Sequence, residues 1–149
     1  MRRFGGAGVR TIPTPHDARD GVCFVVEAEH KRLGILTDLG HVFPGLEELI
    51  RSLDAVILES NYEPDLLERG PYPPYLKARI RGPRGHLSNV EAADLLARCG
   101  RNLRWAALGH LSEQNNSPDV ALRRGRQAVG DVVCVHLASR YEPTALMEV

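Results

Sequence analysis

Residues 54–60 read Asp54-Ala55-Val56-Ile57-Leu58-Glu59-Ser60, an almost unbroken apolar run that predicts a β-strand covered on both faces. Leucine and isoleucine recur at helical spacing just before it, from Pro44 to about Leu53, and a further apolar run follows at Leu103–Leu108. Strands that alternate with helices imply an α/β fold in which helices flank the sheet. The strand at residues 54–60 therefore decides the fold class.

The other predicted elements fit the same layered arrangement. Val22–Ala28 and Leu33–Thr37 lie on either side of a polar turn, which predicts an antiparallel hairpin and hence a mixed sheet. A capping box from Ser88 to Glu91 begins a helix that ends near Cys99. The remaining expected elements are a short helix at Pro64–Arg69, a helix from Ser117–Pro118 to about Val129, and a last strand at Asp131–Ala138.

Two segments lack a clear pattern. Arg2–Gly8 is glycine-rich and basic, and we expect it to be frayed or to join a further segment. Residues 63–84 are less regular, and after the short helix they contain the stiff aromatic stretch Pro71-Tyr-Pro-Pro-Tyr75. Neither segment predicts a strand.

Composition restricts the class of protein. The 149 residues include 19 basic and 19 acidic side chains and are 43% hydrophobic, which fits one soluble domain and argues against a disordered or strongly charged tail protein. No apolar run approaches the roughly 18–20 residues that span a bilayer. The cysteines, Cys23, Cys99 and Cys134, form no CxxC pair, so we expect buried thiols in a reducing compartment and a cytoplasmic protein.

Polar residues follow three of the predicted strands, at the positions where α/β folds bind ligands. Asp38 follows the hairpin, Glu59-Ser60-Asn61 ends the central strand, and His110 follows the strand at residues 103–108. Each of these residues alone fits a cap or turn better than a site, but their recurrence at the same kind of position favours a site. Imidazole and carboxylate together suit zinc, manganese or iron at a hydrolytic centre.

The histidines differ in context. His16 stands beside Asp17 ahead of the first predicted strand, which fits a metal ligand with a supporting carboxylate or a simple turn residue. His86 directly precedes the capping box. The other histidines are His30, in a polar turn, and His136, inside the last strand, both interpreted as structural, and His41, which stays ambiguous.

Six blocks of the sequence, in this order, resemble the metallo-β-lactamase-fold hydrolases, and most closely their YycJ/WalJ-like branch, related to the phosphodiesterases and tRNA 3′-processing nucleases of that fold. The resemblance runs from about Val9 to Val135, and six ordered blocks make it far more specific than one short motif. The blocks are His16-Asp17, Gly34-Ile-Leu-Thr-Asp-Leu-Gly-His41, Leu58-Glu-Ser-Asn61, Gly70-Pro-Tyr-Pro-Pro-Tyr-Leu-Lys77, Gly85-His-Leu-Ser-Asn89 and Gly109-His-Leu-Ser-Glu-Gln-Asn-Asn116.

The resemblance implies a metal-dependent hydrolase of phosphodiester bonds, nuclease- or exonuclease-like, that acts on DNA or RNA with a water activated by two divalent ions, Zn or Mn. In this interpretation His16 and His110 are metal ligands and Asp38 is the carboxylate that bridges the two ions. His86 would protonate the leaving oxygen or bind the scissile phosphate. Asp38 and His86 are therefore the predicted catalytic residues.

Basic side chains close to His86 in the sequence offer contacts to a substrate phosphate, namely Lys77, Arg79 and Arg84. A solvated loop face explains them equally well. Tyr72 and Tyr75 could stack on bases or a sugar, although packing beneath the proline-rich loop is the favoured interpretation.

The defining HxHxDH motif of the family, which supplies several metal ligands, is absent. The resemblance is thus to the C-terminal part of the domain, and residues 1–149 are expected to form a partial metallo-β-lactamase fold, half of an αββα sandwich. We expect Met1 to be an internal or mis-assigned start or the gene to be truncated, in preference to an N-terminal half supplied by another polypeptide. An uncovered sheet then predicts self-association.

Two other functions stay open. One is a catalytically inactive or truncated metallo-β-lactamase-fold module that acts in binding only, which the missing motif favours. The other is a hydrolase of a cyclic phosphate, thioester or lactam, against which the His86 block favours phosphodiesters. The expected partners are a nucleic acid or a small phosphodiester, no membrane, and the missing N-terminal half or a second copy of the chain.

Overall fold

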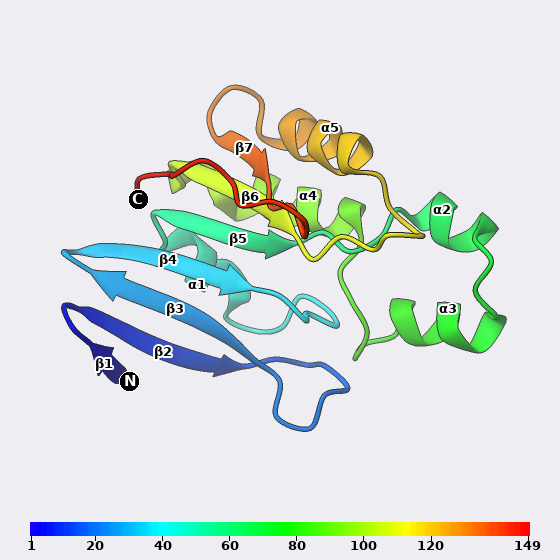
Figure 1. Cartoon of the computed structure of the whole chain (residues 1–149), viewed down its shortest axis with the longest axis horizontal. Coiled ribbons are helices and arrows are strands. Elements are labelled where there is room, and N and C mark those ends of the chain that lie inside the picture. The colour runs from blue at the N-terminus through cyan, green and yellow to red at the C-terminus, as the bar shows by residue number, and fades with distance from the viewer.

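Seven strands form one mixed sheet in the computed structural model, which describes residues 1–149 (Figure 1). The strands lie in the sheet in chain order. From β1 to β4 neighbours are antiparallel, and from β4 to β7 they are parallel. The strands are β1 (Arg2–Phe4), β2 (Ala7–Pro13), β3 (Val22–Ala28), β4 (Lys31–Leu36), β5 (Ala55–Glu59), β6 (Trp105–Gly109) and β7 (Cys134–Leu137).

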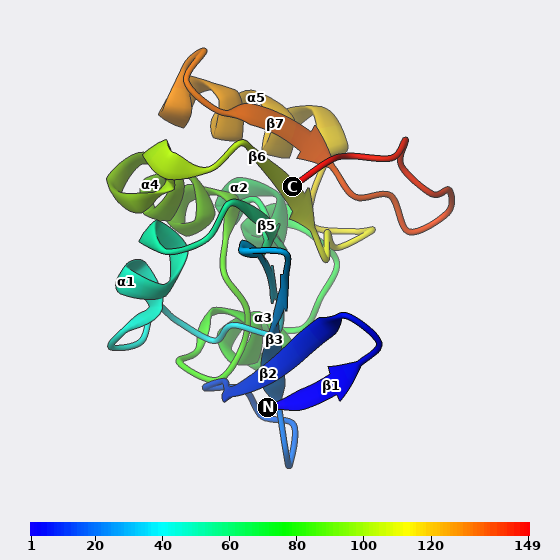
Figure 2. The same cartoon turned by 90° about the vertical axis from the view of Figure 1, so that its left-hand side faces the viewer.

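Helices cover one face of this sheet (Figure 2). This face carries α1 (Leu46–Arg51), α4 (Asn89–Cys99) and α5 (Pro118–Val129), with a 3-10 turn at Gly100–Asn102. Beyond the carboxyl ends of the strands lie α2 (Pro64–Arg69) and α3 (Pro74–Arg81) (Figure 1). Leu36, Leu58 and Leu108 on the sheet share one buried core with Leu95 and Leu96 of α4. The predicted capping box is present, because the Ser88 side chain accepts a hydrogen bond from the backbone of Glu91. None of the helices combines the length and apolarity needed to cross a membrane.

The opposite face of the sheet is covered only in part, by the last residues of the chain. Met147 and Val149 pack against a small buried cluster of Ala55, Trp105 and Ala107. The indole Nε1 of Trp105 donates a hydrogen bond of 2.8 Å to the carbonyl of Glu148. Elsewhere on the sheet Val22 and Phe24 remain 37% and 38% exposed. This is the arrangement of a single sheet with helices on one side, so the predicted α/β fold class is confirmed.

The N-terminal residues correct one expectation. Arg2–Gly8 is not frayed: Arg2 pairs with Val9 and Phe4 with Ala7 in a β1–β2 hairpin. Gly5 takes a φ of 59°, so the glycines that suggested disorder form the tight turn of that hairpin. β2 then continues as far as Pro13, a stretch in which the sequence predicted no strand.

Two further expectations need correction. Residues 74–81 form α3, although the proline-rich sequence there suggested an irregular stretch, because Pro74 sits in the first turn, where proline is tolerated. Of the cysteines, Cys23 and Cys99 are buried as predicted, but Cys134 is exposed at the start of β7.

Candidate metal centre

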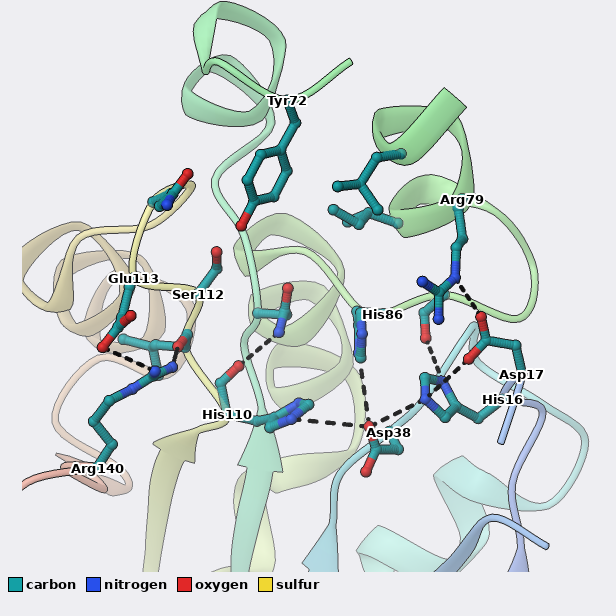
Figure 3. Close-up of a pocket in the computed structure, with 16 residues that line it drawn as sticks. His16, Asp17, Asp38, Tyr72, Arg79, His86, His110, Ser112, Glu113 and Arg140 are labelled. Atoms are coloured by element: carbon teal, nitrogen blue, oxygen red, sulfur yellow. Dashed lines mark hydrogen bonds and ion pairs between the residues drawn. The ribbon is translucent and has the colours of Figure 1, made fainter. Parts of the chain in front are cut away.

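The predicted site residues meet at the carboxyl edge of the parallel strands (Figure 3). Asp38 follows β4, Glu59 ends β5 and His110 follows β6, and these strands are parallel neighbours whose ends lie together. His16 comes from the loop after β2, and His86 from the loop before α4. The structure thus brings the four residues that the sequence singled out, His16, Asp38, His86 and His110, to one place, together with Glu59.

The imidazoles surround one carboxylate. The Nε2 atoms of His16 and His110 lie 3.3 Å and 3.8 Å from Oδ1 of Asp38. The ring of His86 stands between the other two, with its centroid 4.9 Å from that of His16 and 5.2 Å from that of His110. Asp38 therefore holds the central position that its predicted bridging role requires, although that role stays a prediction.

Glu59 is the residue that organises the two histidines on its side. Its side chain is fully buried, and its Oε1 accepts hydrogen bonds of 2.7 Å from Nδ1 of both His86 and His110. Oε2 accepts from the backbone amides of Leu39 and Leu87, at 2.7 Å and 3.3 Å. Burial by itself would raise the pKa of Glu59, but the bonds from His110 and His86 outweigh it and hold that pKa below its ordinary value.

These hydrogen bonds fix which ring nitrogens carry protons. A carboxylate only accepts, so Nδ1 of His86 and of His110 must donate to Glu59. Likewise Nδ1 of His16 lies 2.9 Å from the carbonyl of Gly85 and must donate to it. Each neutral ring then has its lone pair on Nε2, which is the state in which a histidine binds a metal while its other nitrogen is held by a carboxylate or carbonyl.

The donor set fits a divalent ion. Asp38, Glu59, His86 and His110 each have a potential ligand atom within 4.8 Å of the others. We assign Glu59 a supporting role, because its oxygens already accept four hydrogen bonds and its side chain is fully buried. His16, Asp38 and His110 present free lone pairs, as does His86, whose predicted role is toward the leaving group. Imidazole with carboxylate is a set that zinc and manganese accept.

Two of these residues have a strained backbone. Asp38 and His110 adopt φ values of 58° and 57°, in the left-handed region that residues with a side chain seldom occupy. Side-chain amides support His110: Asn61 donates to the His110 carbonyl at 2.7 Å, and Asn116 donates to the carbonyls of Ser60 and Asn61 at 2.7 Å and 2.9 Å. The polar residues after β5 therefore shape the turn that carries His110.

A tight junction holds the loops of His16, Asp38 and His86 together. The Gly40 amide donates to the carbonyl of Pro15, and the Asp17 amide to the carbonyl of Arg84, both at 3.0 Å. A Cβ on Gly40 would lie 2.2 Å from the Pro15 oxygen and 2.4 Å from the Pro83 oxygen, so only glycine fits there. His41, left ambiguous by the sequence, contacts the same junction, where its Nδ1 donates a hydrogen bond of 2.7 Å to the Pro83 carbonyl.

A pocket of about 510 Å³ opens over the centre, and only one of the three predicted phosphate contacts lines it. Arg79 lines this pocket and pairs with Asp17, and the same pairing lowers the pKa of that carboxyl. Arg84 instead reaches the His16 carbonyl, and Lys77 donates to the carbonyl of Glu68; neither lines the pocket.

Of the two tyrosines singled out by the sequence, only one lines the pocket. Tyr72 lines it, whereas Tyr75 is 76% exposed and does not, so the expected packing of Tyr75 beneath the proline-rich loop is wrong. Asp17 differs from expectation too, because Gly85 and not Asp17 accepts from Nδ1 of His16. Asp17 lies on the Nε2 side instead, 3.4 Å from that atom.

The sequence marked Glu59 as one of the polar strand ends that favour a site, but it predicted no role for this residue. The available signal was a glutamate that closes an otherwise apolar, doubly covered strand, where an ionised side chain is costly unless several donors meet it. His30 and His136, interpreted as structural, lie away from the centre, in the β3–β4 turn and in β7.

Comparison with known proteins identifies relatives of this arrangement. The chain is 31% identical over 121 residues to the exodeoxyribonuclease WalJ of Streptococcus pneumoniae, an alignment that covers 80% of this chain and 45% of that protein. It is 27% identical over 157 residues to the exodeoxyribonuclease YycJ of Bacillus anthracis, covering 100% of this chain and 60% of the relative. The chain thus spans about half the length of the curated relatives it matches. No family model matches it.

Solved structures agree on the fold. The metallo-β-lactamase-fold protein YhfI of Bacillus subtilis superposes with a TM-score of 0.67 at 14% sequence identity, over 92% of this chain and 48% of that one. At 14% identity the similarity to YhfI concerns the fold alone, whereas the two exodeoxyribonucleases are also similar in sequence. Together they show that this chain belongs to the metallo-β-lactamase-fold proteins, in the YycJ/WalJ-like branch that its motifs resemble.

Proposed function

We propose that this chain carries part of the metal centre of a phosphodiester hydrolase, an exonuclease-type enzyme that acts on DNA. The observation that carries the proposal is the geometry around Asp38, toward which the Nε2 atoms of His16 and His110 converge at 3.3 Å and 3.8 Å. Two curated relatives are named exodeoxyribonucleases, which favours DNA over RNA.

Divalent ions, Zn or Mn, would supply a Lewis acid for the phosphoryl oxygen and lower the pKa of a water that attacks phosphorus. His16, Asp38 and His110 would hold them, with Asp38 between the two histidines. Glu59 keeps the lone pair of His110 on Nε2, so the ligand is presented in the correct tautomer. These side chains would bind the ions and orient them, and they are the part of the centre that this chain contributes.

His86 is placed to handle the leaving group. Its Nδ1 is bound to Glu59, and the residue lines the same pocket as Asp38 and His110. Nε2 is therefore the atom that, in the doubly protonated ring, would bind the scissile phosphate or donate its proton to the departing oxygen. Arg79, the predicted phosphate contact that lines the pocket, would hold a phosphate oxygen once Asp17 releases it.

The three donors are fewer than two metal sites need. We therefore expect the remaining ligands to come from a further polypeptide segment or a second copy of the chain, in line with the half-length match to the relatives. Without that segment or second copy, binding of the ions should be weak but measurable.

Metal titration of the chain tests the proposal first. Zn²⁺ or Mn²⁺ binding, followed by calorimetry, should fall at least tenfold in Asp38→Asn and in His110→Ala, because each removes one of the proposed ligands. His136→Ala is the matched control, since it removes an exposed histidine of β7 outside the pocket. Equal metal affinity in all four proteins would contradict the proposed centre.

Turnover is the second test. The metal-loaded chain should hydrolyse bis(p-nitrophenyl) phosphate, and end-labelled single-stranded DNA should be shortened from one end, with both activities lost in His110→Ala. The alternative is a module that binds DNA without cutting it, which the absence of an HxHxDH motif favours. Binding of DNA that His110→Ala leaves unchanged, with no product on either substrate, would establish that alternative.

A further inference from the structure

A second pocket, of about 770 Å³, lies beside the metal centre. It shares one wall with the pocket over the metal ligands, and its other residues come from β5, the end of β6, the start of α5 with the loop before it, β7 and the segment that follows β7. The shared residues are His110, Leu111, Ser112, Glu113 and Arg140. The two pockets are therefore consecutive parts of one groove, with His110 at the boundary.

The lining of the second pocket differs from that of the first. Titratable side chains dominate the metal pocket, whereas Ile57, Leu137 and Tyr141 contribute apolar surface to its neighbour. Ser139 and Asn116 add hydrogen-bonding groups. An apolar cavity with a small number of polar groups suits a flat, partly polar ligand, and a volume of this size accommodates a small molecule.

Arg140 places a cation at the boundary between the pockets. Figure 3 shows it on the other side of His110 from His16 and Asp17. Its guanidinium lies 3.0 Å from a Glu113 oxygen and donates to the Leu111 carbonyl at 2.6 Å. The hydroxyl of Tyr141 also donates to Glu113. These contacts fasten residues 140–141 to the loop after β6 and hold the Tyr141 ring at the pocket.

We propose that this second pocket is a nucleobase subsite. It would receive the base of the nucleotide next to the scissile phosphate, with the base against Tyr141 and the apolar walls and with Arg140 against a phosphate oxygen. The proposal rests on the proposed function, because it is the phosphate at His110 that brings a base to this wall. An aromatic ring and a cation at one site are the features that bind single-stranded nucleic acid without strong sequence preference.

Binding of small ligands to the full chain tests the subsite without any need for turnover. NMR titration compares thymidine 5′-monophosphate with deoxyribose 5-phosphate, which has the same phosphate and sugar but no base. We expect the nucleotide to bind about tenfold more tightly, the effect of one stacked base, with shifts at Leu137 and Tyr141. Tyr141→Ala should abolish this difference and Tyr141→Phe should keep it, since phenylalanine retains the ring and loses only the bond to Glu113.

Tyr141 is 77% exposed, so neither variant threatens the fold. Arg140→Gln should weaken both ligands by the same factor, because it removes a phosphate contact common to the two. Equal affinities of the two ligands for the unmodified chain, or a difference that Tyr141→Ala leaves intact, would overturn the subsite. A pocket filled by a protein segment in solution would give the first of these results.

Different experimental results would overturn the subsite and the proposed function. Metal-dependent hydrolysis of bis(p-nitrophenyl) phosphate with no base-dependent binding would leave the function standing and overturn the subsite. Base-dependent binding that Tyr141→Ala abolishes, with equal Zn²⁺ affinity in the unmodified chain, Asp38→Asn and His110→Ala, would support the subsite and overturn the function.

Discussion

Replacing Glu59 by glutamine should separate the stability of the fold from the chemistry of the centre. The substitution keeps the shape of the side chain and removes its charge. One oxygen of Glu59 accepts from His86 and His110, and the other accepts from the amides of Leu39 and Leu87. Glutamine has only one accepting oxygen, so its NH₂ group must face one of these two pairs of donors.

The cheaper arrangement follows from which donors can change. Backbone amides cannot become acceptors, but an imidazole can move its proton from Nδ1 to Nε2. With the tautomers of His86 and His110 unchanged, two charge-assisted hydrogen bonds would be lost, at about 1.5–3 kcal/mol each. With both protons moved, the NH₂ group donates to both rings, and we expect the free energy of unfolding to fall by only about 1–3 kcal/mol. The cost then appears elsewhere, because Nε2 of His110 no longer has a lone pair for a metal.

Nitrogen-15 NMR of the histidine rings measures this directly. In the unmodified chain we expect Nδ1–H in His16, His86 and His110, and in Glu59→Gln we expect Nε2–H in His86 and His110 alone. His16 is an internal control, because its Nδ1 donates to the Gly85 carbonyl and not to Glu59. Zn²⁺ affinity should fall about 10- to 100-fold. Unchanged tautomers with unchanged metal affinity would refute the supporting role of Glu59.

Three further perturbations have defined outcomes. Gly40→Ala should lower the free energy of unfolding by about 1–3 kcal/mol in urea titrations and weaken metal binding, because its Cβ would lie 2.2 Å from a carbonyl oxygen; an unchanged midpoint would contradict the close approach. Iodoacetamide should alkylate exposed Cys134 well before Cys23, whose pKa burial raises to about 12, as peptide mass spectrometry would show. Arg124 lowers the pKa of Glu63, so this pair stabilises the fold above the ordinary pKa of 4.5 and less as the pH falls through the lowered value. Glu63→Gln should therefore lower the free energy of unfolding by about 1 kcal/mol at pH 7, a small effect because Arg124 is partly exposed. In acid unfolding experiments, the free energy of unfolding of the variant should also fall less steeply as the pH decreases.

The fold was predictable wherever the sequence contained a strong local pattern. The run at residues 54–60 and the capping box at Ser88 each gave an element within a few residues of its observed bounds, because burial on both faces and a reciprocal cap leave few alternatives. β1 and β2 were missed, since an edge hairpin with exposed arginines has no apolar alternation to detect. α3 was missed because none of its residues is buried and it therefore lacks an apolar face.

The site was predictable as a set of residues but not as an arrangement. Position after a strand singled out Asp38 and His110, because the topology of parallel strands brings their ends together. It gave no information on hydrogen-bond partners. That Gly85 and not Asp17 holds His16, and that one buried carboxylate holds His86 and His110, depends on loop conformations that no short-range pattern encodes.

The strained backbone at His110 explains why so many buried polar groups lie beside it. A left-handed φ in a residue with a side chain costs on the order of 1–3 kcal/mol and persists only if its surroundings impose it. Asn61 holds the His110 carbonyl, and Asn116 holds the backbone on either side of Asn61, so three side-chain hydrogen bonds hold the turn in place. An apolar residue at Asn61 would leave that carbonyl unpaired and let the turn move, withdrawing Nε2 from Asp38. The polar residues that end an otherwise apolar strand are thus needed to present one imidazole.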